Sequence, residues 1–160
     1  MDTALSAPEF IRTDSQNPGF QALVVLLDEY LAFLDGDEHE FYAQFNKTAH
    51  LKNVVVGYIN NKAVATSALR EIDLGPGIVE IKRMYTVPEY RGRGIALGIL
   101  KELETWALEL GYHTFLLETG KRQPEAIRLY EKAGYIRTPN YGQYQNVENS
   151  VCMKKYIEAI

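Results

Sequence analysis

Apolar residues recur along the chain with two different periods, and these periods predict alternating strands and helices. From Phe20 onward the apolar positions fall three and four residues apart, which predicts a long helix that ends at the turn residues Asp35-Gly36-Asp37. Glu9 to Thr13 fits a short strand before it, and a second helix is predicted from Glu38 to about Thr48.

Runs of β-branched residues follow this helical part and predict a hairpin and a central strand. Val54 to Ile59 and Ala63 to Ile72 flank the dipeptide Asn60-Asn61, so the pair reads as an antiparallel hairpin with a tight turn. Ile78 to Val87 has the β-branched and aromatic content of a central strand. Pro88 ends that strand because proline has no amide hydrogen to give to a ladder.

The C-terminal half predicts two more helices and three more strands. Apolar residues from Ala96 to Leu110 mark one face of a long amphipathic helix, and Gly111 suits its C-terminal cap. Thr114 to Glu118 is a short apolar strand, and a helix opens with Pro124 and runs to Gly134. Tyr135 to Tyr156 predicts two final strands around a loop rich in Asn, Gly and Gln. The whole pattern is typical of a single α/β domain with a mixed sheet.

Composition narrows the classes of function. A chain of 160 residues fits one domain, and its formal net charge of −4 argues against a nucleic-acid partner, which usually meets a basic face. The longest apolar run, Ala22 to Leu27, is far too short to span a membrane, and Met1 to Pro18 lacks the features of a signal peptide. We therefore expect a cytoplasmic protein with no membrane partner.

The cysteine and histidine content adds no chemistry of its own. Cys152 is the only cysteine, so an intramolecular disulfide is excluded, and we expect it to be a small buried apolar residue. The three histidines, His39, His50 and His113, do not have the spacing of metal ligands. We expect no metal.

A glycine turn, Arg91 to Ala96, joins the predicted central strand to the long amphipathic helix. Gly92 and Gly94 permit φ values that other residues avoid and allow the backbone to approach a ligand closely. The first amides of the helix have no partner within it, and with the helix dipole they form an anion site suited to phosphate oxygens. The alternative is a tight connection whose glycines serve packing alone.

The spacing in the glycine turn excludes two other phosphate-binding motifs. The chain contains no G-x-x-x-x-G-K-[ST] pattern, which removes the Walker type of P-loop. The dinucleotide-binding fingerprint needs a third glycine where Leu97 stands.

Residues Glu80 to Gly134 resemble the GCN5-related N-acetyltransferase (GNAT) family in two ordered motifs. The coenzyme A signature of that family, R/Q-x-x-G-x-G/A, is matched by Arg91, Gly94 and Ala96. Its downstream pattern A-x-x-L-Y-x-x-x-G is matched by Ala126, Leu129, Tyr130 and Gly134. The resemblance implies a mixed, mostly antiparallel sheet of about six to seven strands with helices on both faces.

The resemblance also implies acetyl-CoA as cosubstrate and a set of residues that bind it. Its pantetheine arm would lie between Ile78–Val87 and Thr114–Glu118 and would bond to the backbone of Tyr85, Thr86 and Val87. The pyrophosphate would be held by backbone amides of Arg91, Gly92, Arg93, Gly94, Ile95 and Ala96. Three residues in the region of the next helix complete the set: Gln123, Ala126 and Lys132. Many relatives carry Asn at the position of Gln123. Lys132 either faces the 3′-phosphate or is a solvated lysine.

The implied reaction is transfer of an acetyl group to a primary amine by direct attack in a ternary complex. Tyr130 matches the family's general acid, because a phenol can protonate the departing coenzyme A sulfur. The alternative is a core tyrosine at helical spacing. Glu80 is the candidate base, and the alternative is a strand glutamate paired with Lys82 or Arg83.

Other functions remain open at the level of sequence. The acceptor is a small-molecule or peptide amine, and a protein lysine or α-amine is a second choice. A non-catalytic acyl-CoA-binding or sensing module would keep the same phosphate site, although the presence of both Tyr130 and Glu80 disfavours it. Edge strands near the C-terminus leave a homodimer open.

Overall fold

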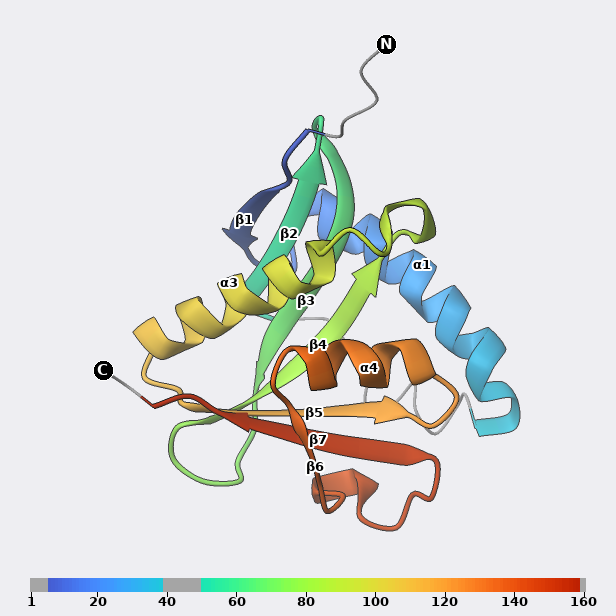
Figure 1. Ribbon diagram of the computed structural model, residues 1–160, viewed down its shortest axis with the longest axis vertical. Helices are drawn as coiled ribbons and strands as arrows, with labels where there is room; N and C mark the ends of the chain where they lie inside the picture. The colour runs from blue at the N-terminus through green and yellow to red at the C-terminus, as the bar shows by residue number, and fades with distance from the viewer. Residues whose placement is uncertain (1–5, 39–49, 159–160) are drawn as a thin grey trace. The chain divides into compact units, whose positions relative to one another are not determined.

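The computed structural model describes residues 6–38 and 50–158, whose strands form one seven-stranded sheet (Figure 1). The strand order is β1-β2-β3-β4-β5-β7-β6. β4 and β5 are parallel, whereas β1–β2, β2–β3, β5–β7 and β6–β7 are antiparallel. The strands are β1 (Glu9–Thr13), β2 (Asn53–Ile59), β3 (Lys62–Glu71), β4 (Ile78–Thr86), β5 (Thr114–Gly120), β6 (Ile136–Thr138) and β7 (Ser150–Tyr156). The predicted fold class, a mixed and mostly antiparallel sheet with helices, is confirmed.

Three α-helices and three short 3-10 helices accompany the sheet in the described residues. The α-helices are α1 (Pro18–Asp35), α3 (Ile95–Glu109) and α4 (Pro124–Lys132). The 3-10 helices are η1 (Gly36–Glu38), η2 (Pro88–Tyr90) and η3 (Gly142–Tyr144). The bounds of the α-helices agree closely with those predicted from apolar periodicity. The further helix predicted from Glu38 to Thr48 lies outside the described residues, except for its first residue, Glu38.

The tertiary contacts divide the chain into two compact units. The first comprises residues 1–69 and 82–103, and the second comprises residues 70–81 and 104–160. The division falls within β3, β4 and α3, so each of these elements contributes residues to both units. The expectation of a single domain stays a prediction.

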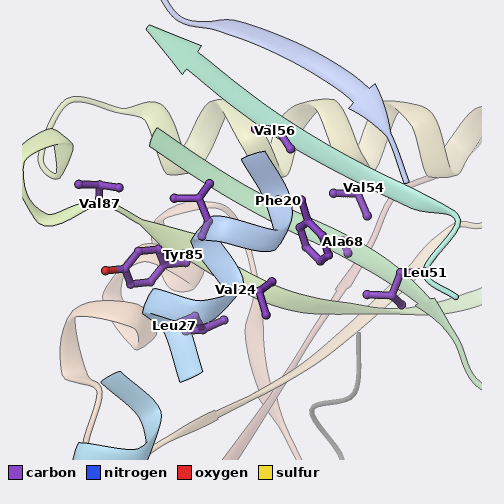
Figure 2. Packing of buried hydrophobic residues seen from close by; sticks show 10 residues of the cluster. Phe20, Val24, Leu27, Leu51, Val54, Val56, Ala68, Tyr85 and Val87 are labelled. Carbon is purple, nitrogen blue, oxygen red and sulfur yellow. The ribbon is translucent and has the colours of Figure 1, made fainter. Parts of the chain in front are cut away.

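The core of the first unit lies between α1 and the strands β2 to β4. Figure 2 shows Phe20, Val24 and Leu27 of α1 packed with the buried side chains of Leu51, Val54, Val56, Ala68, Tyr85 and Val87. Successive residues of a strand point to opposite faces, so Val54 and Val56 face α1 whereas Gly57 faces the other way. A Cβ atom on Gly57 would lie 3.3 Å from Ile99 of α3, so α1 and α3 cover opposite faces of β2.

Local signals in the sequence explain where α1 and the hairpin begin and end. The Asn17 side chain accepts a hydrogen bond of 3.0 Å from the Phe20 amide, and Pro18 occupies the first turn of α1. At the hairpin, Asn60 and Asn61 have φ values of 50° and 67°, the left-handed conformation that a tight two-residue turn requires.

The core of the second unit includes residues of β5 and β7 and a hydrogen-bonded buried glutamate. Phe115 and Met153 are fully buried there, and the hydroxyl of Tyr135 donates to Glu104 over 2.8 Å. Lys155 also donates to Glu104, over 2.9 Å, so the buried carboxylate has a charged partner. Cys152 is 1% exposed, as expected of a small apolar residue, and burial raises the pKa of its thiol to about 11.

No helix among residues 6–38 and 50–158 combines the length and the apolar character needed to cross a membrane.

Candidate functional site

The glycine turn of the first unit has an open backbone with two residues in the left-handed region. Gly92 and Gly94 have φ values of 79° and 78°. A Cβ atom added to either would meet nothing within 4 Å, so close packing does not account for these glycines. The Gly94 carbonyl accepts from the Gly98 amide over 3.1 Å, which makes Gly94 the residue at which α3 opens. The turn thus leaves open space beside its two glycines at the start of a helix, where an anion site is expected.

Arg91 holds the glycine turn in place with its own side chain. Its Nε donates to the Thr86 carbonyl at the end of β4 over 2.8 Å. Its guanidinium also lies over the rings of Tyr30 and Tyr85, at 5.8 Å and 5.5 Å from their centroids. Arg91 is thus a positioning residue, and Arg93, whose guanidinium lies 5.6 Å from the centre of the Tyr90 ring, is exposed at the turn.

The end of β4 corrects one detail of the predicted cofactor contacts. The Val87 amide donates to the Val64 carbonyl over 2.8 Å, and the Val87 carbonyl accepts from the Tyr90 amide over 2.9 Å. The Val87 amide is therefore not available to a pantetheine arm. Because backbone groups alternate between the two edges of a strand, Tyr85 shares the orientation of Val87, and the opposite edge belongs to Met84 and Thr86. Met84 is a residue that sequence reasoning missed.

Tyr130 of α4 lies in the second unit and is almost fully buried. It is 6% exposed, and its ring packs edge-on against Tyr135 with 6.0 Å between centroids. Burial raises the pKa of its phenol well above the ordinary value, and the nearby charge of Glu118 raises it further. Tyr130 therefore keeps its proton over the whole physiological pH range, as a general acid must before it donates.

Glu80 of β4 is also in the second unit, where both of its carboxylate oxygens are engaged. It is 1% exposed, Arg70 lies 3.1 Å from Oε1, and the Tyr141 hydroxyl donates to Oε2 over 2.5 Å. The ion pair with Arg70 was not among the predicted alternatives, and Arg83, one of the two predicted partners, pairs with Asp28 instead. A carboxylate has about four lone-pair positions, so these two contacts still leave Glu80 able to accept a proton.

Glu118 of β5 is a carboxylate near Tyr130. The sequence analysis named it only as the last residue of a predicted strand. It is half-buried and accepts a hydrogen bond of 2.7 Å from the Ser150 hydroxyl. Its charge contributes to the raised pKa values of Tyr130, Tyr144 and Cys152, after burial in each case. Glu118 and Tyr130, the predicted general acid, thus belong to one cluster of ionisable side chains in the second unit.

The loop between β6 and β7 adds two tyrosines to this cluster. Tyr141 and Tyr144 pack edge-on, with 5.8 Å between ring centroids, and the charge of Glu80 raises the pKa of each phenol after the larger effect of burial. Asn140 holds the loop through hydrogen bonds from its side chain to the carbonyls of Val147 and Ser150, at 3.1 Å and 3.2 Å. The cluster therefore combines two carboxylates with three phenols.

The remaining predicted cofactor residues lie on or beside α4. Gln123 is half-buried at the N-cap of α4 but makes no capping bond with its side chain, which leaves the amide group for another role. Ala126 is half-buried in the first turns, and Lys132 is exposed at the last residue of the helix.

The described residues contain no group of three or more His, Cys, Asp or Glu side chains placed to hold a metal ion. His113 has a structural setting: its ring lies against Gly77, and its Nδ1 is 2.8 Å from the Thr114 hydroxyl oxygen.

Comparison with known proteins gives one consistent result. The model of the acetyltransferase (GNAT) family matches residues 20–135 of the chain. An uncharacterised N-acetyltransferase of Schizosaccharomyces pombe is 37% identical over 50% of the chain and 48% of its own length. The IAA acetyltransferase of Azospirillum brasilense is 37% identical over 52% of the chain and 55% of its own length. The chain thus spans about half the length of these curated relatives.

Solved structures agree with the family match over nearly the whole chain. A candidate acyl-CoA N-acyltransferase from Klebsiella pneumoniae superposes with a TM-score of 0.78 and 27% identity, covering 94% of this chain and 98% of that one. The PaiA N-acetyltransferase of Thermoplasma acidophilum, solved with coenzyme A, gives 0.69 at 14% identity, with 94% and 99% covered, a likeness of fold.

Proposed function

Because the chain belongs to the acetyltransferase (GNAT) family, we propose that it transfers an acetyl group from acetyl-CoA to a primary amine by direct attack in a ternary complex. The observation that carries this proposal is Tyr130. It occupies the tyrosine position of the family's A-x-x-L-Y motif, it is buried, and its phenol is held in the protonated form beside Glu118. A module that only binds the cofactor has no need of a buried acid next to a carboxylate.

The glycine turn fits the pyrophosphate of acetyl-CoA. Gly92 and Gly94 leave open space above the backbone, and the amides that begin α3 supply donors for phosphate oxygens. Arg91 ties the turn to the end of β4 through the Thr86 carbonyl, and Arg93 adds a positive charge at the surface of the turn. The amide of Thr86, whose carbonyl bonds Arg91, and the backbone of Met84 supply the strand edge proposed for the pantetheine arm.

The proton path that we propose uses Glu118 and Tyr130 together. Glu118 takes a proton from the acceptor ammonium, and the free amine attacks the thioester carbonyl. As the carbon–sulfur bond breaks, Tyr130 gives its proton to the sulfur and then recovers one from the new amide nitrogen. Burial is the larger cause of the raised Tyr130 pKa and the Glu118 charge the smaller, so protonation of Glu118 removes the smaller one and strengthens the acid at the stage at which it donates. Glu80 is the alternative base.

Substitution of Gly94 tests the phosphate site. We expect Gly94→Val to weaken acetyl-CoA binding at least about tenfold, since the branched side chain fills the space above the turn and resists a φ of 78°. Gly111→Val is the matched control, because Gly111 also has a positive φ, 96°, and open space around it. Calorimetric titration of both variants should show the loss only at position 94, and equal losses would refute the site.

Release of free coenzyme A thiol tests the function itself. Thiol release from acetyl-CoA, measured over a panel of small amines, peptides and proteins, should be stimulated by at least one amine. Tight acetyl-CoA binding with no amine-stimulated release would support the sensing module instead, and failure to bind acetyl-CoA would overturn both functions.

A further inference from the structure

Arg83 of β4 is a buried arginine whose guanidinium is mostly unpaired. Its side chain is 1% exposed, and Nη2 donates to Oδ1 of Asp28 on α1 over 2.5 Å. The other two nitrogens, Nε and Nη1, are buried and have no hydrogen-bond partner. Asp28 is 53% exposed, so the ion pair leads from the interior of the first unit to its surface.

The unpaired donors match a further anionic group. Arginine has five N–H donors and keeps its charge at every physiological pH, so a single contact with Asp28 leaves most of them unused. Buried polar groups almost always have a partner, and leaving an ionised one unpaired is costly. A carboxylate is a planar anion whose two oxygens fit the fork of an arginine, which makes it the natural complement.

The backbone of Arg83 is strained at the same point. Its φ of 60° lies in the left-handed region, which bulky residues avoid. Strain of this kind tends to persist at functional sites, where the surrounding structure imposes it. A buried, partly paired and strained arginine is therefore a candidate ligand-binding residue on three separate grounds.

The position of Arg83 connects it with the transfer reaction. It lies two residues before Tyr85, and at about 3.3 Å per residue of strand this separation is roughly 7 Å. Figure 2 shows Tyr85 beside Leu27 of α1, the residue that precedes Asp28. Arg83 and Tyr85 therefore reach the same helix from neighbouring positions of the strand proposed to bind the cofactor.

We propose that Arg83 binds a carboxylate of the acyl acceptor, so that the acceptor is a small amine that also carries a carboxylate, such as an amino acid. This inference rests on the proposed acetyltransferase function. Asp28 bonds only Nη2 of the guanidinium before the acceptor arrives, so Nε and Nη1 stay available to the acceptor carboxylate. Charge on the guanidinium then fixes one end of the acceptor and leaves its amine free to attack.

A binding experiment tests the carboxylate site without any need for turnover. The melting temperature of the whole chain is measured in sodium formate and in sodium chloride at equal ionic strength. We expect formate to raise it in the wild type and to raise it more in Asp28→Ala, where formate replaces the lost carboxylate. Arg83→Met should lose the response, and Arg12→Met, which breaks the arginine ion pair with Glu102 in the same unit, should keep it.

An activity experiment tests the acceptor class. Thiol release is compared for amino acids and for their carboxamides, which keep the amine and lack the anion. We expect the acids to be preferred by about 100-fold or more in kcat/KM, because a site built to bond one group rejects the analogue without it. Arg83→Met should lose this preference while its affinity for acetyl-CoA is unchanged.

The outcomes separate this inference from the function on which it rests. If no amine releases thiol but formate stabilises the wild type and not Arg83→Met, the transferase function fails and the anion site stands. If carboxamides or peptide amines without a nearby carboxylate react as well as the acids, the acceptor class is wrong. Equal responses to formate in the wild type and Arg83→Met would show a structural arginine, and the site itself would be overturned.

Discussion

Tyr130→Phe is expected to lower kcat by about 100-fold or more while the dissociation constant of acetyl-CoA changes by less than about twofold. The substitution removes only the hydroxyl and keeps the ring that packs against Tyr135. Without the phenol, the sulfur must leave as a thiolate or take its proton from water. Single-turnover kinetics and calorimetric titration measure the two quantities separately.

The control for this variant is Tyr135→Phe, which also removes a buried phenolic hydroxyl from the second unit. The Tyr135 hydroxyl donates to Glu104, so its loss should lower the free energy of unfolding by about 1.5–3 kcal/mol, the range for a hydrogen bond to a charged group. Its kcat should stay close to that of the wild type. An unchanged kcat in Tyr130→Phe, or an equal loss in both variants, would remove Tyr130 from the reaction.

The pH dependence of the wild type gives a second check on Tyr130. Because burial and Glu118 raise the pKa of its phenol above the ordinary value of about 10, the acid form persists as the pH rises through that value. The activity of the ternary complex should therefore show no alkaline loss from this group below pH of about 10. A loss near pH 8 that disappears in Tyr130→Phe would mean that the phenol is a far stronger acid than its surroundings indicate.

Features that depend on local sequence were predictable, because their physical cause lies within a few residues. The hairpin at Asn60-Asn61 and the glycine turn follow from which residues tolerate a positive φ, and both are found as predicted. Two ordered motifs also located Tyr130 on α4. In each case a short pattern fixes the backbone, and distant parts of the chain change little.

Features that depend on pairing across the sheet were not predictable from one sequence. Which edge of β4 is free depends on the bond from Val87 to Val64, so the predicted contacts Tyr85, Thr86 and Val87 mix the two edges and leave out Met84. The partner of Glu80 is Arg70 of β3, ten residues away, and no local pattern selects it over Lys82.

Glu118 did leave a signal that could have been used. It is the one charged residue in the strand Thr114–Gly120, and a carboxylate in so apolar a strand needs a partner or a function. Arg83 carried no such signal, because a left-handed residue within a strand arises from tertiary packing and has no signature in the residue type.

The two glutamates of the second unit are expected to respond in opposite ways to amide substitution. Glu118→Gln should lower kcat/KM by about 100-fold at neutral pH and remove the acidic limb of the pH–rate profile, because the base that titrates there is lost. Glu80→Gln should keep that limb. It should instead lower the free energy of unfolding by about 2 kcal/mol, since the ion pair with Arg70 is lost and one donor or acceptor is mismatched in a buried site.

The choice of acceptor makes this comparison sharper. An amine that is already neutral at the assay pH has no proton to give up before attack, so it should recover much of the rate lost in Glu118→Gln. It should bring no recovery in Glu80→Gln, where the deficit is one of stability. If Glu80→Gln loses the acidic limb and Glu118→Gln keeps it, the roles are reversed. Glu80 is then the group that accepts the proton, and Glu118 serves only to tune the pKa of Tyr130.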